Sequence, residues 1–270
     1  MKGRRVTCLL AGLLLAGPAG AAAQNLECVI YPETTVAVSS PVEGVLDRVL
    51  VDRGDLVRAG QVVATIESSV ERVAVELARA RAARESAVRS GQARVEFGDR
   101  RYKRTLEMYR RELIPLKEMD EAETSKVLAD FELLEAQEEL KLARIDVDRA
   151  QAVLALRTIR SPISGVVVER LLNGGEFTKQ APIVKLAQID PLRVEVIVPV
   201  ALFGRIKIGM PANVTPEAPV GGTWPARVTV VDRVIDAASG TFGVRLALPN
   251  PAYKLPAGLK CRVQFNGAAR

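Results

Sequence analysis

Two patterns of hydrophobic and polar residues divide the chain. Between residues 69 and 156, Ala, Leu, Glu, Lys and Arg dominate and apolar side chains recur with a seven-residue repeat, which predicts long amphipathic helices. On both sides of this stretch, short runs rich in β-branched residues are separated by Gly and Pro, which predicts strands and turns. The pattern therefore predicts an α+β chain in which a helical segment interrupts β structure.

The helical stretch is predicted to be a hairpin of two antiparallel arms. Its second half carries a coiled-coil seam with alanine at one position, at Leu133, Ala136, Leu140, Ala143, Val147, Ala150 and Leu154. Its first half shows one heptad series, at Ala74, Val88, Val95, Tyr102 and Tyr109, interrupted by Arg81. Gly91 and Gly98 are expected to loosen this arm by up to ~1 kcal/mol each. Pro115 lacks a backbone donor and disfavours helix before it, so we expect the tip near residue 115. An ordinary helical bundle is the alternative, but no third helix is available to cover the pair.

One short motif occurs on both sides of the predicted hairpin. Ser40–Val45 (SPVEGV) returns as Ser161–Val166 (SPISGV), an offset of 121 residues, and Val63 meets Val184 at the same offset. Each copy is typical of strand, turn, strand, turn, strand, and the glycines assigned to turns are Gly44, Gly54, Gly165 and Gly175. A sheet of about 30 residues cannot bury its apolar face alone. We therefore expect the two copies to stack as one β-sandwich, the alternative being two unrelated hairpins.

The C-terminal third is predicted to form a small antiparallel β-barrel. Alternating or β-branched runs predict strands at 193–198, 212–216, 226–235, 243–248 and 260–265, and one short helix is expected within 199–206. Residues 24–35 are a candidate for an extra barrel strand, which would bring Cys28 towards Cys261. An oxidising compartment would permit a disulfide between them, and two separate buried thiols are the alternative.

The N-terminus has the pattern of a secretory signal peptide. Lys2, Arg4 and Arg5 precede an apolar run over residues 8–17, and Ala21–Ala23 is typical of a cleavage site, so we assign residues 1–23 to the signal peptide. The run is shorter than the ~20 residues of a membrane span, although an uncleaved anchor is the alternative. We expect an exported, periplasmic protein.

Charge then argues against a nucleic-acid partner. Removing the three basic signal residues lowers the net charge from +6 to +3. Opposite charges such as Glu96 and Arg100 stand four residues apart, which is typical of a solvated helix face.

The composition also excludes most catalytic and metal chemistry. The chain has no histidine, which excludes Ser-His-Asp and Cys-His catalysis and histidine-containing zinc or haem sites. Three cysteines and four methionines leave little for a soft-metal site. No phosphate-binding loop or GxSxG turn occurs. We therefore expect a protein that is not an enzyme and that carries no metal or cofactor.

The order of half-sandwich, hairpin, half-sandwich and barrel resembles the periplasmic adaptor subunits, also called membrane fusion proteins, of the HlyD/RND efflux family. The resemblance covers residues 36–265. It implies an elongated, multi-domain fold with a split lipoyl/biotinyl-like domain (barrel-sandwich hybrid, 36–68 and 157–189), an inserted coiled-coil hairpin (69–156) and a β-barrel (190–270). In carriers of this fold a lysine is modified at the turn between the halves. Here the first half ends in Ala64–Ser69 without a lysine, so no attached cofactor is expected.

The resemblance also implies a channel-docking tip. The family's tip carries Arg, Leu four positions on and Ser seven further, and these positions fall on Arg104, Met108 and Pro115. Met108 is an apolar substitute for the family's Leu. Pro115 departs from the family's Ser and lacks its hydroxyl. Leu113 and Ile114 lie beside it, and the basic residues that flank the predicted tip are Arg111 and Lys117. Local packing of the turn is the alternative role for the apolar residues.

The resemblance implies a non-catalytic adaptor that links an inner-membrane transporter to an outer-membrane channel. The transporter is expected to be of the RND type, with an ABC exporter as the alternative. Copies are expected to form a homo-oligomer and to associate with the membrane only through partners. An exported carrier-like or carbohydrate-binding β module is a second alternative.

Overall fold

The computed structural model describes residues 25–267, so the predicted signal peptide, residues 1–23, lies outside the described residues. The chain divides into two compact units, one of residues 35–187 and one that combines the segments before residue 35 and from residue 188 onwards. Among the described residues, no helix is both long and apolar enough to cross a bilayer.

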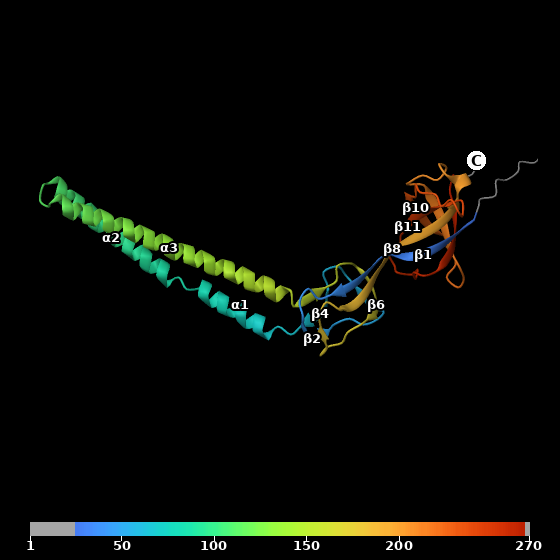
Figure 1. The fold of residues 1–270 in the computed structure, drawn as a ribbon, viewed down its shortest axis with the longest axis horizontal. Helices are drawn as coiled ribbons and strands as arrows, with labels where there is room; N and C mark the ends of the chain where they lie inside the picture. The colour runs from blue at the N-terminus through green and yellow to red at the C-terminus, as the bar shows by residue number, and fades with distance from the viewer. Residues whose placement is uncertain (1–24, 268–270) are drawn as a thin grey trace, which may run out of the picture. The chain divides into compact units, whose positions relative to one another are not determined.

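The helical and strand elements follow one another as labelled in Figure 1. The helices are α1 (Ser69–Ala82), α2 (Ser86–Arg110), α3 (Leu116–Ala155) and the one-turn 3₁₀ helix η1 (Val200–Leu202). The strands are β1 (Leu26–Ser39), β2 (Gly44–Val49), β3 (Leu56–Val57), β4 (Val62–Ile66), β5 (Thr158–Arg160), β6 (Gly165–Arg170), β7 (Phe177–Thr178), β8 (Pro182–Pro199), β9 (Pro211–Pro216), β10 (Trp224–Val231), β11 (Thr241–Leu248) and β12 (Lys260–Phe265).

The two motif copies form one sandwich by interlocking. In the first copy β2 pairs with β4, and in the second copy β6 pairs with β8. The short middle strands cross over, since β7 pairs with β2 and β3 pairs with β6. The register Gly44 opposite Thr178 becomes Gly165 opposite Val57 at the same 121-residue offset. The stacked sandwich is confirmed, but each sheet contains a strand from both copies, which makes the halves interdependent.

The core of the sandwich repeats the same symmetry. Leu46 and Val167 are equivalent buried residues, as are Val63 and Val184. These side chains are at most 1% exposed. The apolar face that neither copy could cover alone is therefore buried between them.

The four motif glycines serve two purposes. Gly54 and Gly175 lie in equivalent turns with φ of 93° and 87°, a left-handed conformation that favours glycine. Gly44 and Gly165 were also expected in turns, but they are the first residues of β2 and β6. At Gly44 a Cβ would lie 2.8 Å from Cγ2 of the buried Ile66 and 2.8 Å from the Arg157 guanidinium, so the position needs glycine for space.

The hairpin consists of α3 packed along both α1 and α2 (Figure 1). The least exposed residues of α3 recur at three- and four-residue spacing, beginning with Met119, Ala122 and Ala129 and continuing along the predicted leucine–alanine seam. On the first arm the buried residues are Val75, Ala78, Gly91 and Gly98. The pair therefore packs through a narrow seam of small residues.

The expected single heptad series of the first arm is wrong. Ala74 is exposed, and the inward residues of α1 are Val75, Ala78 and, in part, Ala82, whereas α2 resumes the seam at Val88. Ala82 and Val88 are six residues apart, so in an unbroken helix their side chains would point in directions roughly 120° apart. The helix is interrupted at residues 83–85, and this interruption returns both segments to the seam.

Gly91 and Gly98, which are expected to loosen this arm through their low helix propensity, also have a role in its packing. A Cβ on Gly91 would lie 3.1 Å from the Leu133 Cα, and one on Gly98 would lie 3.4 Å from the Lys126 Cα. Both glycines are buried against α3. They allow the close approach of the two arms.

The barrel contains the strand order β1-β12-β9-β10-β11-β8, with β1 also paired to β8. Its core includes Ile30 from β1 and Leu192 from β8, both fully buried. β10 is shorter than predicted, because it ends at Val231 and residues 232–240 form a loop closed by the Asp236–Thr241 bridge. Together with the sandwich and the inserted hairpin, this barrel confirms the predicted fold class.

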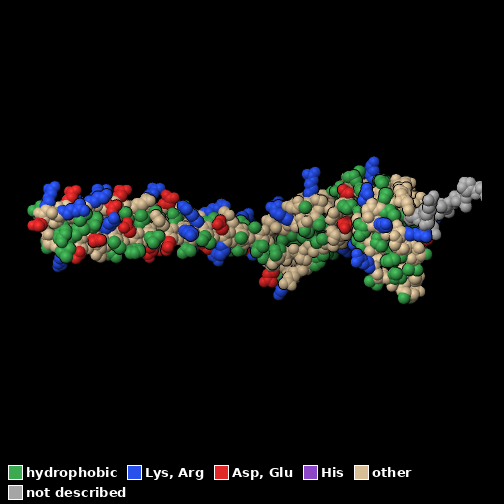
Figure 2. All heavy atoms as spheres, turned by 90° about the horizontal axis from the view of Figure 1, so that it is seen from above, with side chains coloured by type: hydrophobic (Ala, Val, Ile, Leu, Met, Phe, Trp, Pro, Cys, Tyr) green, Lys and Arg blue, Asp and Glu red, His purple; other side chains and the backbone are tan. Residues whose placement is uncertain are grey.

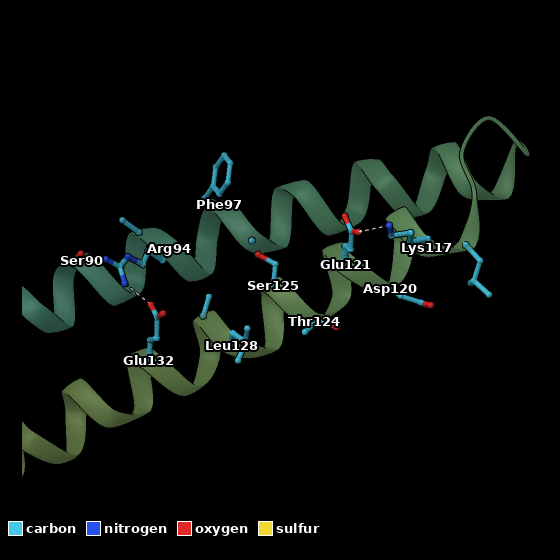
Figure 3. A pocket seen from close by; sticks show the side chains of 14 residues that line it. Ser90, Arg94, Phe97, Lys117, Asp120, Glu121, Thr124, Ser125, Leu128 and Glu132 are labelled. Atoms are coloured by element: carbon cyan, nitrogen blue, oxygen red, sulfur yellow. Dashed lines mark hydrogen bonds and ion pairs between the residues drawn. The ribbon is translucent and has the colours of Figure 1, made fainter.

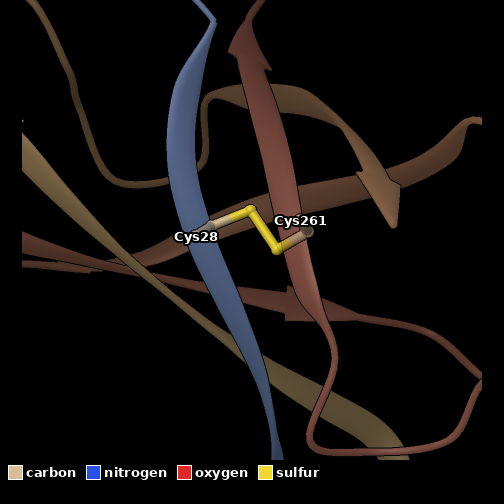
Figure 4. Close-up of a disulfide and its surroundings, with 2 residues drawn as sticks. All are labelled: Cys28 and Cys261. Atoms are coloured by element: carbon tan, nitrogen blue, oxygen red, sulfur yellow. A yellow bond between two sulfur atoms is a disulfide. The ribbon is translucent and has the colours of Figure 1, made fainter. Parts of the chain in front are cut away.

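A disulfide joins the first and last strands of the barrel (Figure 4). Cys28 and Cys261 are direct partners in the β1–β12 register, and each is 3% exposed. Residues 26–29 thus form the extra strand next to β12, covalently attached to it.

Candidate docking site on the helical hairpin

The tip is a tight reversal of five residues. α2 ends at Arg110 and α3 begins at Leu116. The N–H of Leu113 donates to the carbonyl of Met108 at 3.0 Å, and Glu112 adopts a left-handed φ of 57°. Pro115 is extended and precedes the first turn of α3, where its missing N–H leaves no bond unmade.

The tip exposes apolar side chains next to positive charges. Leu113 is 66% exposed and Leu116 is 56% exposed, whereas Ile114 is partly covered. Arg111 and Lys117, on either side of the reversal, are both exposed. Packing of the turn can therefore explain why an apolar side chain stands at Ile114, but it leaves Leu113 and Leu116 uncovered. Apolar residues beside basic ones at a projecting end are typical of a docking surface.

The structure brings together two of the three residues matched to the family's tip pattern. Arg104 and Met108 stand four residues apart on α2 and share one face near its end. Arg104 is exposed and Met108 is 45% exposed. Pro115 lies outside both helices, so it does not belong to that face.

A groove of about 1060 Å³ follows the same half of the hairpin (Figure 3). Its lining includes the small residues Ala93, Gly98 and Ala129 and the large apolar residues Phe97 and Leu128, which are 56% and 57% exposed. The sequence prediction did not include this groove. The signal that could have identified it is the placement of these two large apolar residues outside the heptad seam.

Ion pairs hold the two arms together beside the groove. The Arg94 guanidinium lies 2.5 Å from the Glu132 carboxylate, and Lys126 Nζ lies 2.9 Å from Asp99 Oδ1. Lys126 lowers the pKa of Asp99 by a hydrogen bond and by its charge, and Asp99 raises the pKa of Lys126 in the same way. These charges stabilise the pairing of α2 with α3.

The outer face of α3 carries a second apolar surface. Leu128, Phe131, Leu142 and Ile145 lie outside the seam, and their exposure ranges from 53% to 66%. We call these four residues the outer α3 face. Figure 2 shows apolar patches between interspersed acidic and basic side chains along the hairpin. A helix that is apolar on two sides has one side free for another chain.

A partly buried ion pair fixes the base of the hairpin. The Arg157 guanidinium lies 2.5 Å from a Glu71 carboxylate oxygen and donates to the Glu43 carbonyl at 3.1 Å. The two side chains are 23% and 15% exposed. The pair therefore joins the start of α1 to the segment that follows α3.

Each resolved pKa shift, at Glu67, Asp99, Lys126 and Asp236, has a hydrogen bond as its first cause, and for Asp99 and Lys126 that bond joins the two arms of the hairpin. Within residues 25–267, no three His, Cys, Asp or Glu side chains are gathered as a metal site. Between β4 and α1, the turn that would carry a modified lysine is Glu67–Ser68.

Comparison with protein families matches two models in tandem. A CzcB-like barrel-sandwich hybrid domain matches residues 34–188, and a CusB-like β-barrel domain matches residues 192–269. The first match alone covers more than half of the chain and includes the hairpin insertion.

Individual relatives and one solved structure also match along most of the chain. The nickel and cobalt resistance protein CnrB of Cupriavidus metallidurans is 27% identical over 97% of this chain and 64% of its own length. The membrane fusion protein MtrC of Neisseria gonorrhoeae is 28% identical over 87% of this chain and 58% of its own length. The chain thus spans about three fifths of the length of these relatives. The crystal structure of MacA from Actinobacillus actinomycetemcomitans shares the fold, with a TM-score of 0.74, 21% identity, and coverage of 90% of this chain and 78% of that one.

Proposed function

Because this chain belongs to the membrane fusion protein family of periplasmic adaptors, we propose that it links an inner-membrane transporter to an outer-membrane channel. It acts without catalysis, in the periplasm, after the signal peptide is cleaved near Ala23. The hairpin tip docks on the channel, and the contacts couple the two membrane proteins.

The observation that carries this proposal is the exposed apolar tip of a hairpin inserted between the two halves of one sandwich. Leu113 and Leu116 are uncovered in the single chain and are flanked by Arg111 and Lys117. A protein surface of this kind supports docking by burial of its apolar centre within a polar rim. Arg104 and Met108 extend the surface along α2.

A photo-crosslinking experiment tests the tip. A benzophenone amino acid at Met108 is expected to form an adduct with an outer-membrane protein in intact cells. Leu113→Asp should reduce that adduct about tenfold, because it places a charge in the apolar contact. Leu50→Asp is the matched control, since Leu50 is 53% exposed and lies outside the hairpin. An adduct that Leu113→Asp leaves unchanged would contradict docking by the tip.

The transporter is proposed to be of the RND type. The matched β-barrel model belongs to an RND-associated class of such barrels, and an ABC exporter is the alternative. The gene next to this one provides a direct test: a neighbouring RND pump supports the proposal, and a neighbouring ATP-binding exporter supports the alternative.

Copies of the chain are proposed to pack side by side through the outer α3 face. Four large apolar side chains on one helix favour burial against another protein surface. Photo-crosslinking from Phe131 is expected to yield a dimer adduct, which Leu142→Asp weakens and Leu50→Asp does not. A crosslinked product without a second copy of this chain would reject self-association through this face.

A further inference from the structure

One end of the barrel gathers two loops, the start of β1 and the end of β12. β8 ends at Pro199 opposite Thr241, the first residue of β11. The N–H of Val200 donates to the carbonyl of Gly240 at 2.9 Å, which holds the loop after β8 against the loop before β11. The N–H of Gly209 donates to the carbonyl of Val228, so the same loop continues along β10.

These two loops expose apolar side chains. Val234 is 83% exposed, Ile208 71%, Phe203 46%, Val200 44% and Ile235 38%. We call these five residues the barrel-end patch. Phe203 contacts the buried ring of Phe242 edge-on, at 5.3 Å between ring centroids, so one of its sides is supported while the other faces outward. The loops are thus anchored to the core while they present apolar side chains to their surroundings.

Basic residues are interleaved with the barrel-end patch. Residues 200–208 include Arg205 and Lys207 and no acidic residue, and Arg233 precedes Val234 in the second loop. All three basic side chains belong to exposed residues. Positive charge beside projecting apolar residues is the chemistry that recognises an anionic lipid surface.

The two acidic residues of the second loop are engaged elsewhere. The Asp236 carboxylate accepts the N–H of Ala238 at 2.9 Å within its own turn. Asp232 lies against Gly243, because a Cβ added there would be 2.2 Å from its carboxylate oxygen. Both residues are exposed, but the Asp236 carboxylate is held against its own turn and the Asp232 carboxylate lies beside β11, while the basic residues flank the apolar ones.

The N-terminal strand begins at this same end. Leu26 pairs with Val263 near the end of β12, and Phe265 of β12 pairs with Ala212 at the start of β9, directly after the first loop. In the sequence, the apolar run of residues 8–17 that is predicted to direct export precedes β1 closely.

We propose that the barrel-end patch binds directly to the anionic surface of a phospholipid bilayer. The apolar side chains enter the headgroup region, and Arg205, Lys207 and Arg233 contact lipid phosphates. The adaptor would then contact the membrane itself as well as its protein partners, which revises the expectation of association through partners only. The proposal is independent of docking by the hairpin tip.

Vesicle flotation tests this contact. The protein accumulated in the periplasm is mixed with vesicles of phosphatidylglycerol and phosphatidylethanolamine, or of phosphatidylcholine alone. It is expected to float with the anionic vesicles, less with the neutral ones, and less as salt is added. Equal binding to both kinds of vesicle, or none to either, would overturn the proposal.

Two matched double variants test whether vesicle binding depends on the barrel-end patch. Phe203→Asp with Val234→Asp should reduce the floated fraction about tenfold or more, because two apolar contacts become charges that anionic lipid repels. Val70→Asp with Val73→Asp is the control, since these α1 residues are 73% and 63% exposed and lie outside the barrel. Circular dichroism confirms that both variants are folded. Unchanged flotation of the barrel variant would reject the site.

A photo-crosslinker at position 234 in cells separates lipid from protein. A lipid adduct on the periplasmic protein supports the proposal. A discrete protein adduct at this position, without a lipid adduct, would show that the barrel-end patch is a protein interface instead.

Discussion

Arg157 connects three parts of the chain through one side chain. It bonds to Glu71 at the start of α1 and to the Glu43 carbonyl just before β2, while it lies itself between α3 and β5. Gly44 leaves the space that its guanidinium occupies. A local group of residues at the base therefore attaches the hairpin to the sandwich.

Glu71→Gln should destabilise the protein by about 1–3 kcal/mol, because it leaves a mostly buried guanidinium without its anion. Urea denaturation followed by helical circular dichroism measures the change. Glu85→Gln is the control, since Glu85 pairs with Arg89 on the hairpin surface at 49% and 77% side-chain exposure. That exposed pair is expected to contribute less than about 1 kcal/mol. An equal effect of the two substitutions would show that the Glu71–Arg157 ion pair contributes no more to stability than an exposed ion pair.

The pair of Asp99 and Lys126 predicts a pH dependence of the hairpin. The pKa of Asp99 is lowered from its usual 3.8, so its contribution to stability is present above that pH and is lost as pH falls through the lower folded value. The pKa of Lys126 is raised from 10.5, so its contribution is lost only as pH rises through the higher folded value.

Asp99→Asn should therefore lower the melting temperature at neutral pH and cease to do so in strong acid. Thermal melts of both proteins between pH 2 and 7 measure the difference. Asp120→Asn serves as the control, because the Asp120 carboxylate forms no ion pair with any residue that the structure describes. A melting difference for Asp99→Asn that stays constant down to the lowest pH would contradict the assigned ion pair.

At the scale of elements, the first arm of the hairpin is built for close approach. Gly91 faces the Leu133 backbone and Gly98 faces Lys126, so the distance between the arms is set by positions without side chains. The two sites differ, because a Cβ at Gly98 would make an ordinary contact of 3.4 Å while one at Gly91 would be at 3.1 Å.

Gly98→Ala should stabilise the hairpin by about 0.5–1 kcal/mol through its higher helix propensity. Gly91→Ala should gain less or should destabilise, because α3 must move away from the new methyl group. Hydrogen exchange of α2 amides reports both effects locally. An equal gain at the two positions would show that the close approach at Gly91 does not limit the seam.

The elements themselves could largely be predicted from the sequence. The repeated SPxxGV motif indicated the sandwich, because a shared offset reflects shared backbone geometry, and the leucine–alanine seam indicated α3. The strand exchange between copies could not be predicted, since β3 and β7 each contain only two residues and their partners lie in the distant copy. The break at 83–85 was missed, because Ala74 and Val75 are both apolar and either could continue a heptad. At the candidate site, the exposed tip was predicted but the groove beside Phe97 was not.

At the scale of the whole molecule, the disulfide joins residues that are 233 positions apart. It attaches β1, the first described strand, to β12, the last one. Because β1 also pairs with β8, the bridge secures both sides of the strand that completes the barrel. We expect this link to restrict the unfolded chain more than any local contact.

Replacing both Cys28 and Cys261 with serine should lower stability by about 2–5 kcal/mol. The pair must be changed together, since a single substitution leaves a free thiol. Urea denaturation of the oxidised protein, the double variant and the reduced protein measures the effect. The reduced protein should resemble the variant. If neither differs from the oxidised protein, the covalent link adds nothing to the packing of β1.

The interlocked sandwich has a consequence for the order of folding as the chain is exported. β2 cannot pair with β7 until residue 178 has crossed the inner membrane, by which time the whole hairpin has crossed as well. The arms α2 and α3 are neighbours in sequence, and such local contacts form fastest. Once the two arms have paired, they hold the ends of the two halves of the sandwich close together. The loop-closure entropy lost when residue 44 pairs with residue 178 is therefore greatly reduced. The helical hairpin would thus form before the sandwich and would bring the two halves of the sandwich together.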